Sequence, residues 1–245
     1  MRRLVRVERR KSASWAETLS TLTADGLWTT IRSYLGIGRR WRQPPITDAD
    51  GLRQFLETRA SFVAQTSLYG YVRTRAGMRY PELFDDDGFV VSLNVAKWQI
   101  WLACLSDIAV HAGGRLAVER VATEPEIGRL IQRLVADILE RTGIPQDAGP
   151  AFAESARLVQ ERIAACDWAA VGGAEDAFTE SPPSLVRWAP IVDELKQLDE
   201  PIVLNSVRFR WQEVRRDLAK ALDAAAVLGA DAVAPADAPS PAISR

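Results

Sequence analysis

The feature that most constrains the fold of this 245-residue chain is the spacing of its apolar side chains, which recur every three or four positions in most segments. That spacing places them on one face of an α-helix. Short alternating runs joined by hairpin turns, the pattern of a sheet, are not found in the sequence. The sequence therefore predicts an all-α protein, an irregular helical bundle of about six or seven helices.

Capping residues and glycines indicate where the predicted helices begin and end. Asp48 can cap a helix that stops before Gly77, and Thr123 with Glu126 has the spacing of a capping box for a helix that ends near Gly143. The other predicted helices cover residues 15–35, 87–111, 147–168, 185–198 and 201–229. Of the prolines in this part of the chain, Pro190 either kinks its helix or opens the second half of it, and Pro201 is predicted to start the last helix.

The segment from Asp87 to His111 is the most apolar part of the chain and resembles a membrane span in length. Lys97 and Asp107 interrupt it, and an ionised side chain at the centre of a bilayer is costly. We therefore predict a buried core helix. The acidic run Asp85-Asp86-Asp87 is expected to cap its amide end, and His111 is expected at its carboxyl end, where the helix dipole favours a histidine.

The first 44 residues carry ten basic and three acidic side chains, a net charge of +7 that leaves −8 for the rest of the chain. Such an arm attracts anions, either at an anionic membrane surface or on an acidic protein partner. The alternative is that its apolar stripe docks on the protein's own core while the arginines are solvated. Nucleic acid is an unlikely partner because no fold for reading it is recognisable. The residues predicted to bind the membrane or partner are Trp15, Leu19, Leu22, Trp28, Arg39, Arg40, Trp41 and Arg42.

These patterns divide the chain into a basic amphipathic arm (residues 1–44), a helical bundle domain (45–229) and a disordered Ala/Pro-rich tail (230–245). Cys104 and Cys166 stand in apolar helical patterns, so we expect both to be buried. No apolar run of signal-peptide length follows the basic start of the chain, which favours a cytoplasmic protein. The last helix carries Arg208, Arg210, Arg215, Arg216 and Lys220 beside its apolar stripe, as either a second partner surface or a solvated face.

His111 is the single histidine of the chain, so an imidazole-dependent hydrolytic site would have to include it. Ser106 is a candidate nucleophile on the same predicted helix, although a spacing of five residues turns the two side chains to different faces. The motif GxSxG is not found in the sequence. The sequence contains no recognisable metal-binding or cofactor-binding motif, so catalytic residues stay unknown and we predict no cofactor.

A second group of residues, Tyr69, Arg73, Arg79 and Tyr80, crowds the end of the helix that stops before Gly77. Arginine forks suit carboxylate and phosphate groups, so these residues are candidates for a polar ligand pocket. The alternative is an ion-paired turn between two helices.

The stretch Phe62–Tyr71, followed by Arg79–Phe84, Lys97 and Cys104–Asp107, resembles an uncharacterised family of bacterial all-helical proteins. Some members of that family carry the name esterase. The resemblance covers residues 62–107 and implies a helical fold and an ester-hydrolysing activity, without carrying over any catalytic residue.

Two functions follow as expectations. The first is a helical adaptor or assembly factor, peripheral at the inner face of a membrane, whose bundle holds a protein partner. The second is a helical, esterase-like enzyme acting on a small ester or anionic substrate, with Ser106, His111, Arg73 and Arg79 as its candidate residues.

Overall fold

The computed structural model describes residues 44–171 and 177–233, and the regular elements in these ranges are all helical. Among the described residues, the one extended pairing is an isolated parallel bridge between Ile46 and Leu222. The eight α-helices of this part are α3 (Ala49–Ala76), α4 (Asp87–Val118), α5 (Glu124–Thr142), α6 (Phe152–Ala164), α7 (Trp168–Val171), α8 (Ser181–Trp188), α9 (Asp193–Ala221) and α10 (Ala224–Val233). Two 3-10 turns, η1 (Gly77–Arg79) and η2 (Pro81–Asp85), join α3 to α4. The predicted all-α class is confirmed.

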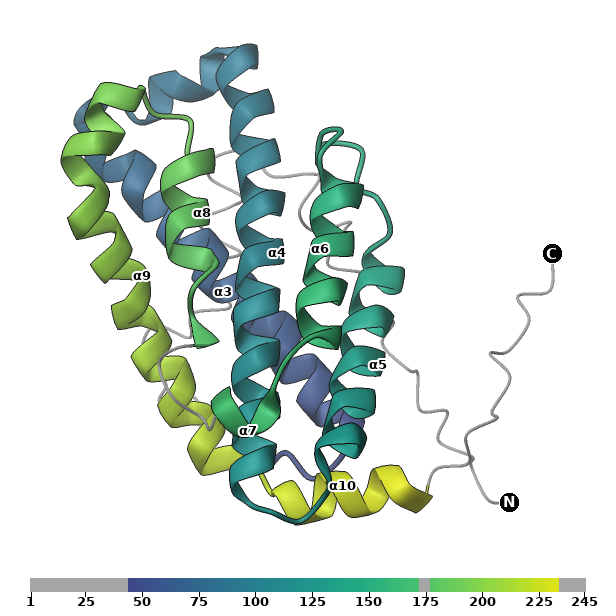
Figure 1. The fold of residues 1–245 in the computed structure, drawn as a ribbon. Helices are drawn as coiled ribbons and strands as arrows, with labels where there is room; N and C mark the ends of the chain where they lie inside the picture. The colour runs from purple at the N-terminus through teal and green to yellow at the C-terminus, as the bar shows by residue number, and fades with distance from the viewer. Residues whose placement is uncertain (1–43, 172–176, 234–245) are drawn as a thin grey trace, which may run out of the picture. The chain divides into compact units, whose positions relative to one another are not determined.

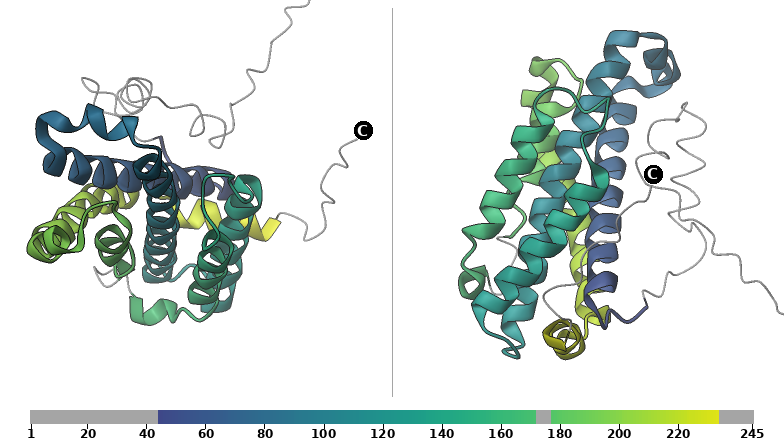
Figure 2. Two further views of the ribbon diagram at one scale, coloured as in Figure 1. Left: turned by 90° about the horizontal axis from the view of Figure 1, so that it is seen from above. Right: turned by 90° about the vertical axis from the view of Figure 1, so that its right-hand side faces the viewer.

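Helix α4 is the core helix of this unit, with α3, α5, α6, α7 and α8 packed around it (Figure 1). By length and composition alone it is the one helix among the described residues that could cross a membrane. More than half of its most apolar stretch is buried inside the structure. The views in Figure 2 show the neighbouring helices on several of its sides. Its apolar residues are therefore explained by contacts with protein, as predicted for a core helix.

The predicted caps at the amide ends of these helices are present. The Asp48 carboxylate accepts a hydrogen bond from the Gly51 amide at 2.7 Å, and Asp86 accepts one from the Phe89 amide at 3.1 Å. The capping box at the start of α5 is also formed between Thr123 and Glu126. These carboxylates and hydroxyls satisfy amides that have no partner inside their helices.

The carboxyl end of α4 differs from the expectation. The helix continues through His111 to Val118, so His111 lies inside the helix and is buried, and the interpretation as a helix-terminal histidine is wrong. The reason lies at Gly113, where a Cβ atom would come within 2.2 Å of the Trp168 ring. Gly113 does not stop the helix; it makes room for α7 to pack against α4.

The segment predicted as one helix over residues 147–168 contains two shorter elements. Helix α6 begins only at Phe152, because Gly149 has a positive φ of 74° and lies tightly against Val95, which makes the preceding residues a turn. Helix α6 then ends at Ala164, and α7 follows as a separate short helix at Trp168–Val171.

Helix α9 corrects the predicted role of Pro201. The proline does not start a helix but lies inside α9, and Pro190 falls in the break between α8 and α9. A proline inside a helix removes one amide donor. Tertiary contacts hold the helix on either side of it: Asp199 pairs with Arg75 of α3, and Val203 is buried.

The last helix ends earlier than predicted and is followed by another. Helix α9 stops at Ala221, where the Ile46 amide donates to the Ala221 carbonyl at 2.8 Å and the Asp223 amide donates to the Ile46 carbonyl at 3.0 Å. Helix α10 then extends to Val233, past the predicted start of the tail at residue 230. The remainder of that tail lies outside the described residues.

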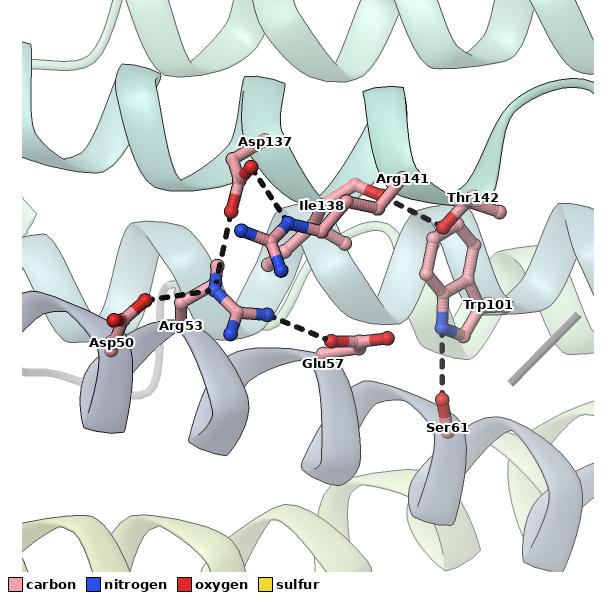
Figure 3. Close-up of polar contacts among 9 residues, drawn as sticks. All are labelled: Asp50, Arg53, Glu57, Ser61, Trp101, Asp137, Ile138, Arg141 and Thr142. Carbon is pink, nitrogen blue, oxygen red and sulfur yellow. Dashed lines mark hydrogen bonds and ion pairs between the residues drawn. The ribbon is translucent and has the colours of Figure 1, made fainter. Parts of the chain in front are cut away.

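Polar contacts between α3, α5 and α4 add to the apolar core (Figure 3). Arg53 of α3 pairs with Asp137 of α5 at 3.2 Å and with Glu57 at 3.3 Å. Burial raises the pKa of Glu57, an effect opposed by the charge of Arg53. Beside this network, the Trp101 indole of α4 donates to the Ser61 hydroxyl of α3 at 3.0 Å.

Candidate functional site

Several polar side chains are buried along the apolar helix α4, and they are the candidates for a functional site. They are Lys97, Gln99, Ser106, Asp107 and His111. A buried polar group is costly unless it is hydrogen-bonded, and a buried charge also needs a counter-charge. The partners of these side chains therefore show what each of them does.

Asp107 is completely buried and lies at the amide end of α8. Its carboxylate accepts hydrogen bonds from the Glu180 amide at 3.1 Å, the Ser181 amide at 2.8 Å and the Ser181 hydroxyl at 2.6 Å. The next two residues of α8 are Pro182 and Pro183, which have no amide hydrogen. Asp107 thus accepts from both amide donors that these prolines leave at this end, and it caps α8 from a different helix.

Arg162 of α6 supplies the counter-charge. One of its terminal nitrogens lies 2.8 Å from both the Asp107 carboxylate and the Ser106 hydroxyl, and the other donates to the Ala177 carbonyl at 2.9 Å and the Thr179 hydroxyl at 3.0 Å. About a quarter of the Arg162 side chain is exposed. Arg162 therefore ties α4, α6 and the segment before α8 together. We call Ser106, Asp107, Arg162, Ser181 and Trp211 the buried polar junction.

Helix α9 joins this junction through Trp211, whose indole donates to the Ser181 hydroxyl at 2.9 Å. Phe178 stacks on Trp211 with ring centroids 4.7 Å apart and contacts the His111 ring at 5.0 Å. The polar and aromatic groups of α4, α8 and α9 are thus in one continuous cluster.

Burial is the main influence on the pKa of the Asp107 carboxyl group. It raises the pKa of Asp107, opposed chiefly by the positive charge of Arg162 and by the hydrogen bonds from Ser181. Burial also raises the pKa of the Cys104 thiol, and the nearby Asp107 charge acts in the same direction. A buried thiol with a raised pKa is a poor nucleophile. The predicted burial of Cys104 is confirmed. The prediction for Cys166 is wrong, because Cys166 is only partly buried.

The two residues predicted for a hydrolytic site, Ser106 and His111, are 2% and 1% exposed. The Ser106 hydroxyl accepts a hydrogen bond from Arg162, while the His111 ring contacts Phe178. A catalytic serine needs a base within hydrogen-bond reach and access to substrate. The geometry around both residues instead fits a role in holding helices together.

The four residues predicted for a ligand pocket separate into two groups. Tyr69 and Tyr80 are buried, and Tyr80 is among the groups that raise the pKa of Tyr69, after burial itself. Burial raises the pKa of Tyr80, and the positive charge of Arg73 lowers it. The Arg73 guanidinium is therefore close enough to Tyr80 to affect its pKa. Arg79 is largely exposed and pairs with Glu82 at 3.0 Å. An ion pair is thus present in this inter-helix turn, as the alternative interpretation requires.

Lys97 is a second buried charge of α4, and its partner was not predicted from the sequence. Lys97 donates to Asp147 at 2.9 Å and to Asn94 at 3.3 Å, and Asp147 also accepts from the Trp98 indole at 2.7 Å. Burial lowers the pKa of Lys97, and the contact with Asp147 opposes that effect. A lysine inside an apolar helix is the signal that an acidic partner is needed. The sequence does not reveal which residue that partner is, because Asp147 is 50 positions away from Lys97.

Among the described residues, no group of three or more His, Cys, Asp or Glu side chains is placed to hold a metal ion. The predicted membrane-binding or partner-binding residues, Trp15, Leu19, Leu22, Trp28, Arg39, Arg40, Trp41 and Arg42, lie outside the described residues.

Comparisons with protein-family models, with curated proteins and with solved structures found no match to the chain. The resemblance of residues 62–107 to a helical family stays a prediction.

Proposed function

We propose that the protein is a helical adaptor or assembly factor of the cytoplasm, held at the inner face of a membrane by its N-terminal arm. The observation that carries the proposal is the charge separation within the chain, with +7 in residues 1–44 and −8 in the remainder. Arginines attract anionic lipid headgroups, and tryptophans such as Trp15, Trp28 and Trp41 favour the headgroup level of a bilayer.

The buried polar junction supports a binding function rather than hydrolysis. The Asp107 carboxylate caps α8, and the Arg162 guanidinium donates to two groups of α4 and two groups of the segment before α8. The Ser106 hydroxyl accepts from Arg162, and the Ser181 hydroxyl donates to Asp107. Side chains used in this way position helices. We therefore favour a bundle that presents a surface to a protein partner over the esterase-like alternative.

The membrane part of the proposal is tested by co-sedimentation of the full chain with vesicles. Each arginine near an anionic surface contributes about 1 kcal/mol, so replacing Arg39, Arg40 and Arg42 together with glutamine should weaken binding to phosphatidylserine vesicles roughly 100-fold at low salt. Neutral phosphatidylcholine vesicles should bind the wild-type chain weakly. Equal binding to both vesicle types, or no effect of the triple variant, would overturn the membrane attachment.

A matched control removes three arginines from the helical domain. Arg129, Arg157 and Arg187 are exposed on α5, α6 and α8, so the variant with glutamine at these positions has the same net charge as the arm variant. It should bind anionic vesicles almost as well as the wild type. Equal losses in the two variants would indicate that total charge, and not the arm, controls binding.

Hydrolysis is tested separately with p-nitrophenyl acetate. The proposal expects any slow turnover to persist in Ser106→Ala and His111→Ala. Turnover that disappears in either variant while the helical circular dichroism is unchanged would favour the esterase-like alternative.

A further inference from the structure

Helix α9 has a second apolar face that points away from the helices it packs on. One face is buried against α8 and α3 and carries Val203, Val207, Trp211, Val214 and Leu218. On the other side, Leu198, Ile202 and Phe209 are each 73% exposed. At 3.6 residues per turn, these three side chains fall within about 40° of one another around the helix. We call this set of exposed residues, with Asn205 between them, the outer stripe of α9.

The outer stripe is more than scattered surface hydrophobicity. Single exposed apolar residues are normal, whereas three large ones aligned on one side of a helix favour a contact surface. Helix α9 also lies at one edge of the described helical unit, with α3 and α8 on its inner side (Figure 1). In the view from above, no described helix covers its outer side (Figure 2). Within the part of the chain that the structure describes, the stripe is therefore left uncovered.

The arrangement of residues along the stripe points to a particular occupant. Leu198 and Gln212 are each seven positions from Asn205, on opposite sides of it, while Ile202 and Phe209 are three and four positions away. A two-fold axis passing beside Asn205 would therefore place Ile202 of one copy opposite Phe209 of the other. A symmetric dimer requires such a self-complementary surface, and here the apolar match lies at the centre, with Leu198 of one copy opposite the polar Gln212 of the other.

The charges at the two ends of the stripe follow the same symmetry. Glu194 and Arg216 are each eleven positions from Asn205, one acidic and one basic, and both are exposed. An antiparallel pair of α9 helices would place each Glu194 beside the Arg216 of the other copy. A parallel pair would place like charges together, which is unfavourable.

The same charges disfavour the basic arm of the chain as the occupant. On the side of the helix that carries the stripe, the exposed Glu194 and Glu213 are balanced by the exposed Arg216 and Lys220, so this face has no acidic excess to attract an arm of net charge +7. A second copy of α9 supplies both an apolar partner and charges of the right sign.

We propose that two copies of this chain form a two-fold dimer through antiparallel packing of their outer stripes on α9. The contact from Glu194 to Arg216 is about 33 Å long at 1.5 Å per residue and uses a single helix of each copy, whereas permanent interfaces bury large areas. The dimer is therefore expected to form and dissociate with concentration. This inference does not depend on the membrane attachment proposed above.

The first test is sedimentation velocity of the full chain from 1 to 200 µM. The wild type should shift from monomer to dimer over this range. Ile202→Asp and Phe209→Asp should each weaken association roughly 100-fold or more, because each dimer loses two apolar contacts and gains two buried charges. Leu158→Asp, at an exposed apolar position of α6, is the matched control and should dimerise like the wild type. A monomer at 200 µM, or a dimer that ignores both variants, would overturn the proposal.

The second test uses charge reversal. Glu194→Arg and Arg216→Glu should each weaken the dimer, and the double variant should restore it. All of these side chains are exposed, so the helical circular dichroism should not change. Failure of the double variant to recover association would contradict the pairing of Glu194 with Arg216.

The third test reports the register directly. In a Cys166→Ser background, Asn205→Cys should form an intermolecular disulfide under mild oxidation, because the axis brings the two copies of residue 205 together. Gln212→Cys should not, because its two copies are about 21 Å apart along the helices, far beyond disulfide reach. Equal cross-linking of both variants would rule out the antiparallel register.

Discussion

Replacing Arg162 by methionine is expected to destabilise the protein in a way that depends on pH. Methionine keeps much of the apolar length of the side chain but removes the charge that faces the completely buried Asp107. Breaking a buried ion pair by removing one partner costs about 3–5 kcal/mol. Because a quarter of the Arg162 side chain is exposed, we expect a loss near the lower end of that range, equivalent to a fall in Tm of roughly 6–12 °C.

The sign of the pH dependence follows from the raised pKa of Asp107. A carboxyl group with a higher pKa in the folded protein contributes most stability below its ordinary pKa, and that contribution is lost as pH rises through the folded value. Arg162 is the largest influence that lowers this pKa, so removing it raises the pKa further. The loss in Arg162→Met should therefore be larger at pH 8 than at pH 5.

The measurement is urea unfolding followed by circular dichroism at both pH values. Arg157→Met is the control on the same helix: its ion pairs with Glu154 and Glu161 are on the surface, where such pairs contribute little to stability, so this variant should unfold almost like the wild type. At pH 8 the double variant Asp107→Asn/Arg162→Met should be more stable than Arg162→Met alone, since no buried charge remains. A loss below 1 kcal/mol, or an equal loss at pH 5 and pH 8, would refute the electrostatic account of the junction.

Two further substitutions test the packing of α4. Gly113→Ala would place a methyl group 2.2 Å from the Trp168 ring and should cost about 1–3 kcal/mol of stability. The control, Gly70→Ala, has its nearest contact at 3.5 Å and should be neutral or slightly stabilising. Equal effects of the two variants in thermal unfolding would contradict the contact between Gly113 and α7. Asp147→Asn leaves the Lys97 ammonium without its carboxylate and should cost about 2 kcal/mol at pH 7, less than for a fully buried pair because Asp147 is partly exposed. Burial lowers the pKa of Lys97, so stability rises with pH as that group loses its proton, and the Asp147→Asn loss measured in urea should shrink at pH 10; a constant loss would show that Lys97 is not the cause.

The elements that sequence reasoning predicted well are those whose signals are local. Asp48, Asp86 and the pair Thr123 and Glu126 cap helices as expected, because an N-cap is made by side chains within three residues of the amide that they bind. Gly77 and Gly143 follow helix ends as predicted, both with a positive φ that glycine adopts without strain.

Two of the errors concern helix ends, where the effect of a glycine or a proline depends on its tertiary surroundings. His111 was expected at a helix end, but α4 continues past it, and at Gly113 the Trp168 ring packs where a side chain would be. Pro201 was expected to start a helix but is inside α9, which contacts on both sides hold in place. Neither surrounding is visible within a window of a few residues.

The candidate site shows the same limit. A lysine and an aspartate inside an apolar helix indicated that Lys97 and Asp107 need partners, but nothing local identifies them as Asp147 and Arg162. Helix α8 begins at Ser181, before the predicted start at residue 185, and nothing local shows that a carboxylate from α4 accepts from the two amides at this end. Asp147 is 50 positions from Lys97, and Arg162 is 55 positions from Asp107.

What the sequence determined by itself is the helical class, the caps, the identity of the core helix and the charge separation between the arm and the rest of the chain. Periodicity, capping and net charge depend on residues near one another or on a simple count, so folding is not needed to read them. Only the tertiary structure decided which buried charges pair, which glycine admits a tryptophan and which face of α9 is left exposed, because each of these is a contact between segments that only packing brings together.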